Sequence, residues 1–138
     1  MNEKQTILLL HIAYWIGIIA DAISTIILLL PELAQSVFGL SDISIGEEYL
    51  YISRIAASLM LGWTFLLFWA DRKPVERRGI LLLTIFPVVI GIMISGLLAV
   101  NSDFIILQNI LPLWIFNILL IIIYIISFLK ANELEIKE

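Results

Sequence analysis

The chain has no cysteine, a single histidine and few charges, because only 14% of its 138 residues are Asp, Glu, Lys or Arg. Without cysteine there can be no disulfide, thiolate nucleophile, iron–sulfur cluster or Cys-ligated zinc. The one histidine, His11, has no other metal ligand at helical spacing, so we expect a hydrogen-bonded histidine near the membrane surface. No nucleophile–base pair, glycine-rich phosphate loop or paired carboxylates occur within the apolar segments. The sequence therefore predicts no catalytic residue, metal or cofactor.

Long apolar runs take the place of charge. Hydrophobic residues make up 62% of the sequence, against about 45–50% in soluble domains, and the mean hydropathy is +1.08. Four runs are long enough to cross a bilayer, because a helix rises about 1.5 Å per residue and the hydrocarbon core is about 30 Å thick. We expect an all-α integral membrane four-helix bundle that forms one domain over residues 1–138. The helices are predicted at about 7–30, 47–70, 79–100 and 104–129.

Proline and glycine mark where these helices stop and bend. Pro31 should end the first helix, because its ring biases the preceding residue away from helical geometry. Residues 31–38 then predict a short interfacial helix, with proline in its first turn and Gly39 at its end. Pro87 lies inside the third helix and removes one backbone hydrogen bond, so a kink is expected there.

The basic residues predict the orientation, since those in short flanking loops stay on the cytoplasmic side. Apart from Arg54 inside the second helix, Lys and Arg are confined to the two termini and to the connection between the second and third helices, whereas the charged residues of the opposite connections are all acids. We therefore expect a multi-pass protein of the cell membrane with cytoplasmic N- and C-termini. The basic residues of the termini and this connection are Lys4, Arg72, Lys73, Arg77, Arg78, Lys130 and Lys137, and the opposing acids are Glu32, Asp42, Glu47, Glu48 and Asp103.

The most informative polar residue is Asp21, near the middle of the first apolar run. An unpaired carboxylate there would cost several kcal/mol, so it must be partnered, hydrated or protonated. Arg54 of the second helix and Asn117 of the fourth fall in the same outer half of the bilayer. Because guanidinium binds carboxylate bidentately, we expect an Asp21–Arg54 ion pair with Asn117 as a further donor. The predicted polar cluster also includes Ser24, Thr25 and Ser58.

This cluster has two interpretations. It could be a structural clamp that closes the bundle, or a pocket open to the outside that holds a ligand or a proton. The first functional hypothesis is a non-enzymatic membrane protein that binds a small or lipidic ligand in the cluster, as a component of a transporter. The alternatives are an accessory or structural subunit of a larger membrane complex and, third, a membrane-embedded redox or lipid enzyme. Expected partners are membrane lipids, further copies of the chain or a larger membrane complex, and not nucleic acid.

Several short motifs resemble those of the DoxX-like small four-helix membrane proteins. They are Leu30-Pro31-Glu32 with Phe38-Gly39, the run Ser53-Arg54-Ile55-Ala56-Ala57-Ser58 leading to Gly62, and Arg72-Lys73-Pro74 through Arg77-Arg78. The resemblance implies a four-helix membrane bundle and, as in some members, a link to respiratory quinone chemistry or oxidative-stress complexes. Asp21 matches no DoxX signature, and the sequence shows no redox-active residue. No functional residue is therefore transferred from that family.

Overall fold

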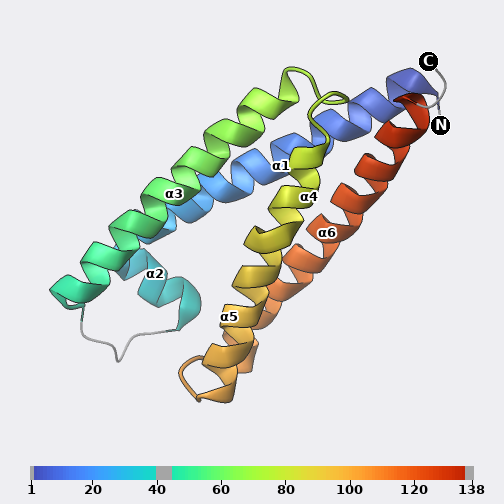
Figure 1. Cartoon of the computed structure of the whole chain (residues 1–138). Coiled ribbons are helices and arrows are strands. Elements are labelled where there is room, and N and C mark those ends of the chain that lie inside the picture. Colours follow the sequence, from blue (N-terminus) through green and yellow to red (C-terminus); the bar gives the residue numbers. More distant parts are fainter. Residues whose placement is uncertain (1, 40–44, 136–138) are drawn as a thin grey trace.

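The computed structural model describes residues 2–39 and 45–135, and within these ranges the chain is helical and contains no strand. Four of its helices are long and apolar enough to cross a membrane. The predicted all-α class with four apolar helices is thereby confirmed (Figure 1). These spans are α1 (Glu3–Leu29), α3 (Glu47–Asp71), a composite helix over Gly79–Asn101 and α6 (Leu107–Glu135).

The first helix begins earlier than predicted because its polar lead forms a capping box. The Asn2 side chain accepts a hydrogen bond from the Gln5 backbone N–H at 2.9 Å, and the Gln5 side chain accepts one from the Asn2 N–H at 3.1 Å. These reciprocal bonds satisfy two amides that a helix start would otherwise leave unpaired. The signal, Asn followed three residues later by Gln, was present in the sequence.

A short helix follows the first span directly. Leu30 is extended (φ −114°, ψ 90°), and α2 (Pro31–Phe38) then starts with Pro31 in its first turn. The helix ends at Gly39, whose φ of +67° lies in the left-handed region that glycine adopts without strain. The side-chain amide of Asn109, near the start of α6, lies beside this glycine and would meet a Cβ there. The turn after α1 therefore brings α2 against the beginning of α6.

The third span is interrupted at Pro87. It consists of α4 (Gly79–Leu83), the irregular segment η1 (Thr84–Val89) and α5 (Ile90–Asn101). Phe86 leaves helical geometry (φ −114°, ψ 117°) immediately before the proline. The expected kink is therefore observed, and it turns α5 relative to α4.

The helices form two pairs that meet at one end. α1 packs along α3, α6 packs against α4, η1 and α5, and the contact between α1 and α6 joins the pairs. Both termini lie where the pairs converge, and α2 lies between the pairs where they separate (Figure 1). We call the converging end, with the termini and residues 72–78, the basic end, and the end with α2 and Asp103 the acidic end. The core lies in the half nearer the basic end, and consists of Leu10, Ala13, Tyr14, Ile18, Leu67, Ala70, Leu81, Ile85, Val89, Leu120, Tyr124 and Ala131.

Candidate functional site

α1 and α6 approach each other closely at Gly17. A Cβ on this glycine would lie 2.0 Å from the Tyr124 hydroxyl oxygen and 2.9 Å from Leu67 Cδ1. Only glycine therefore lets the two helices approach with this tyrosine between them. Tyr124 is fully buried on a stripe of α6 that recurs every three or four residues and faces the bundle. The buried residues of this stripe are Ile110, Asn117, Leu120, Tyr124, Ser127 and Ala131.

Asp21 lies on the same contact, one helical turn from Gly17. Its side chain is buried, and its carboxyl group is close enough to Tyr124 to interact electrostatically with the hydroxyl. Asn117 lies two turns from Tyr124 toward the acidic end, so Asp21 lies between these two residues in depth. Thr25, also buried, follows one turn after Asp21 and donates its hydroxyl to the Asp21 main-chain carbonyl at 2.8 Å. We call Asp21, Asn117 and Tyr124 the seam cluster.

The polar atoms of the seam cluster are buried without partners. Asp21 Oδ2, Asn117 Nδ2 and the Tyr124 hydroxyl have no hydrogen bond within the described ranges, and the same holds for Ser127 Oγ. Each unpaired buried polar group costs about 1–3 kcal/mol. The set combines an acceptor from α1 with donors from α6. The seam cluster thus concentrates unpaired polar groups in the buried part of the bundle.

Arg54 does not join the seam cluster. Its side chain is exposed, and no described carboxylate lies within ion-pair distance of its guanidinium. The preceding residue, Ser53, is buried and donates its hydroxyl to the Leu28 main-chain carbonyl of α1. Since successive helical residues are turned by about 100°, Arg54 points to a different side of α3. The expected Asp21–Arg54 ion pair is therefore absent from the described structure.

The Ser and Thr residues of the predicted polar cluster also differ in burial. Thr25 is on the buried face of α1 with Asp21, and Ser24 is half-buried and bonds within its own helix, to Ala20 O at 2.9 Å. Ser58 is exposed on the same side of α3 as Arg54 and donates to the Arg54 main-chain carbonyl at 3.0 Å. Asp21, Thr25 and Asn117 are therefore buried, whereas Arg54 and Ser58 are exposed.

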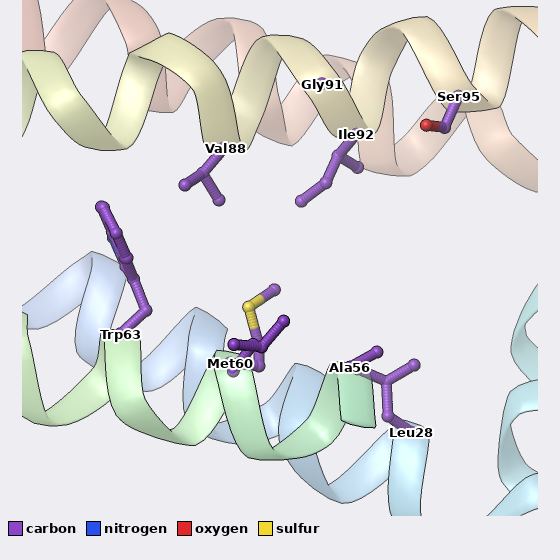
Figure 2. Close-up of a pocket in the computed structure, with 9 residues that line it drawn as sticks. Leu28, Ala56, Met60, Trp63, Val88, Gly91, Ile92 and Ser95 are labelled. Carbon is purple, nitrogen blue, oxygen red and sulfur yellow. The ribbon is translucent and has the colours of Figure 1, made fainter. Parts of the chain in front are cut away.

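An apolar cleft of about 480 Å³ separates α3 from α5. Figure 2 shows Trp63, Met60 and Ala56 of α3 on one side, with Val88 and Ile92 across from them. Apart from the Ser95 hydroxyl and the Trp63 indole nitrogen, the side chains that line it are apolar. They are Leu28, Ala56, Leu59, Met60, Trp63, Val88, Ile92 and Ser95, with Gly91 in the wall.

The cleft is bounded toward the basic end by a hydrogen bond. Trp63 Nε1 donates to Thr84 Oγ1 at 3.2 Å, and Thr84 in turn donates to the Ile80 carbonyl at 2.8 Å. This chain of bonds ties α3 to the kinked segment η1 where the two helix pairs begin to separate. The kink at Pro87 and the Trp63–Thr84 bond therefore fix where the cleft begins. A Cβ on Gly91, farther along the wall, would meet nothing within 4 Å.

A polar network closes the basic end of the bundle. His11 Nδ1 and Asp71 Oδ1 are 2.6 Å apart, which joins α1 to the end of α3, and the Tyr14 hydroxyl donates to the Arg77 carbonyl at 2.9 Å. The Arg77 guanidinium carbon lies 3.5 Å from the centre of the Trp69 ring. His11 is thus hydrogen-bonded, as predicted. Within the described ranges, no group of three or more His, Asp or Glu side chains is placed to hold a metal ion.

Sequence reasoning missed Tyr124 and the cleft for different reasons. A tyrosine near the end of a membrane-spanning helix is commonly an anchor at the membrane interface, although the spacing of seven residues between Asn117 and Tyr124 already places both on one helix face. The cleft has no comparable signal, because Met60 and Gly91 are ordinary residues of apolar helices. Met60 and Gly91 line a cleft only because the two helix pairs diverge at an angle.

No protein-family model matches the chain, and the curated proteins and the solved structures contain no match to it either. The likeness to DoxX-like proteins therefore stays a prediction that depends on short motifs.

Proposed function

We propose that the protein binds the hydrocarbon chain of a lipidic ligand in the cleft between α3 and α5. The observation that carries the proposal is the cleft itself, whose volume of about 480 Å³ lies within the range of about 300–1,000 Å³ typical of small-molecule sites. Its walls come from helices that are long enough to cross a membrane. Its opening is bordered by strongly exposed apolar side chains such as Leu59. A lipid chain is the occupant that matches these walls.

The proposal places the ligand in the cleft and not in the seam cluster. The seam is filled by Tyr124, whose hydroxyl occupies the space over Gly17, whereas the cleft has room for a guest. In this account the seam cluster acts as the structural contact that sets the angle between the two helix pairs. It therefore contributes to ligand binding by keeping the cleft open.

The distribution of charge supports an orientation for this site. With Arg72, Lys73, Arg77 and Arg78 on the cytoplasmic side, both termini would be cytoplasmic and α2 would lie along the outer interface. The cleft extends from Trp63, near the middle of α3, to Leu28, near the acidic end of α1. The ligand would then be a lipid chain of the outer leaflet of the cell membrane.

Native mass spectrometry of the gently purified protein tests the proposal. The wild-type chain should retain a lipidic molecule of defined mass. Gly91→Phe should lose it, because the ring would fill the cleft without meeting a neighbour within 4 Å of the new Cβ. Leu98→Phe is the matched control, since Leu98 is an exposed residue of the same helix outside the cleft lining. Equal retention by wild type and Gly91→Phe, with both folded, would rule the cleft out as the binding site.

A further inference from the structure

One face of α3 is exposed along its whole length. The exposed residues that form it follow one another at alternating spacings of three and four residues. This spacing is the one at which helices pack side by side, because it keeps the same face toward a neighbour for many turns. The face lies on the side of α3 away from the cleft lining, which includes Met60 and Trp63. We call it the outer face of α3, and it consists of Glu47, Tyr51, Arg54, Ser58, Leu61, Phe65, Phe68 and Arg72, all exposed.

Comparison with the other spans shows that this composition is unusual for a lipid-facing surface. The exposed stripe of α1 is apolar from Leu8 through Ile12, Ile19 and Ile26, as contact with lipid requires. The exposed positions of α6 from Ile115 to Leu129 are apolar as well. Among the exposed faces of the four described spans, only the outer face of α3 carries a charged side chain well inside the span, which is Arg54. A lipid-facing surface would not need this charge.

We infer that the outer face of α3 binds a second copy of this chain. Arg54 and Glu47 lie on this face seven residues apart, and neither has an ion-pair partner among the described residues. A two-fold axis along the membrane normal would bring each Arg54 toward the Glu47 of the other copy, giving two reciprocal ion pairs from one surface. The face is therefore complementary to itself in charge.

The geometry of a parallel helix pair permits these contacts. Seven residues correspond to about 10 Å of helix, a distance that the long arginine and glutamate side chains span together. Both copies insert in the same direction, so their α3 helices are parallel and the same residues meet at the axis. Ser58 next to Arg54 is small enough for close approach, and its hydroxyl is already bonded to the Arg54 carbonyl. Leu61 follows at the centre of the face.

Cross-linking of single cysteines in the cysteine-free chain tests this inference. Leu61→Cys in native membranes should form a disulfide-linked dimer of twice the chain mass under mild oxidation. Ile19→Cys on α1 and Ile122→Cys on α6 are matched controls, because both residues are similarly exposed on other faces and should form little dimer. Equal cross-linking at all three positions, or cross-linking of Leu61→Cys to a protein of another mass, would overturn the assignment.

Charge exchange tests whether the ion pairs hold the dimer. In the Leu61→Cys background, Arg54→Glu should weaken self-association at least about tenfold, because it places like charges together. Glu47→Arg should have the same effect. The double variant should recover cross-linking, since the pairs re-form with reversed sign. If the double variant is as weak as the single ones, the proposed contact is wrong. Lipid retention by these variants should stay unchanged, so this outcome is distinct from failure of the cleft proposal.

Discussion

The contact at Gly17 gives the most direct stability prediction. In Gly17→Ala the new methyl group would lie 2.0 Å from the Tyr124 hydroxyl oxygen and 2.9 Å from Leu67 Cδ1. Since both neighbours are fully buried, they cannot move aside without repacking the contact between α1 and α6. Overpacking of this kind costs about 1–3 kcal/mol, and a 2.0 Å contact with a buried oxygen falls at the upper end of that range. Alanine returns up to about 1 kcal/mol through its higher helix propensity, so we expect a net loss of about 1–2 kcal/mol.

The second part of this prediction is rescue by Tyr124→Phe. The tyrosine hydroxyl has no hydrogen-bond partner in the described structure, so removing it alone should change stability little. In the double variant the 2.0 Å contact disappears, and only the milder 2.9 Å contact with Leu67 Cδ1 falls below 3.0 Å. The double variant should therefore regain most of the stability lost by Gly17→Ala.

Unfolding of the purified protein by sodium dodecyl sulfate, followed by circular dichroism, measures these differences. Gly91→Ala is the matched control, because its Cβ meets nothing within 4 Å and it should not destabilise the protein. A Gly17→Ala variant as stable as wild type would refute the close contact between α1 and α6. Failure of Tyr124→Phe to restore the stability lost in Gly17→Ala would refute this contact as well.

Three further predictions follow from the same structure. Asp21→Asn should leave the free energy of unfolding unchanged or raise it, because no described cation pairs with Asp21. A loss of about 3–5 kcal/mol, as expected when a buried ion pair is broken, would contradict this prediction. A double-mutant cycle with His11→Gln and Asp71→Asn should give a coupling of about 0.2–1 kcal/mol, since both side chains of the 2.6 Å pair are partly exposed; a coupling of zero would contradict this prediction. Asp103→Cys should react with an impermeant thiol reagent only from outside the cell, and labelling from the cytoplasm alone would reverse the proposed topology.

The fold was predictable where a local rule decides it. Apolar runs give the four spans, Pro31 and Gly39 bound α2, and Pro87 produces the kink, because each acts through its own backbone geometry. The start of α1 follows a local rule as well, because Asn2 and Gln5 have the spacing of a capping box, which a prediction from apolar runs alone does not use. Local chemistry therefore accounts for the elements and their ends.

The candidate site was predictable only in part, because it depends on which faces meet. Asp21 and Asn117 are predicted from their polarity, and the structure buries both. Arg54 has the right depth to reach Asp21, but its direction around α3 differs from that of the buried Ser53. The depth of a residue in the membrane follows from counting residues along its helix, whereas the neighbour that its side chain faces depends on how the two helix pairs pack. The cleft depends entirely on the angle between those pairs.

Fluorescence quenching of Trp63 by lipids tests the central claim, that hydrocarbon enters the cleft. A variant in which Phe replaces Trp15, Trp69 and Trp114 leaves Trp63 as the single indole, and it can be placed in bilayers whose acyl chains carry bromine near their middle. Strong quenching of Trp63 is expected, together with a clear reduction when Gly91→Phe fills the cleft. Quenching that is the same with and without Gly91→Phe would show that no lipid chain occupies the space between α3 and α5.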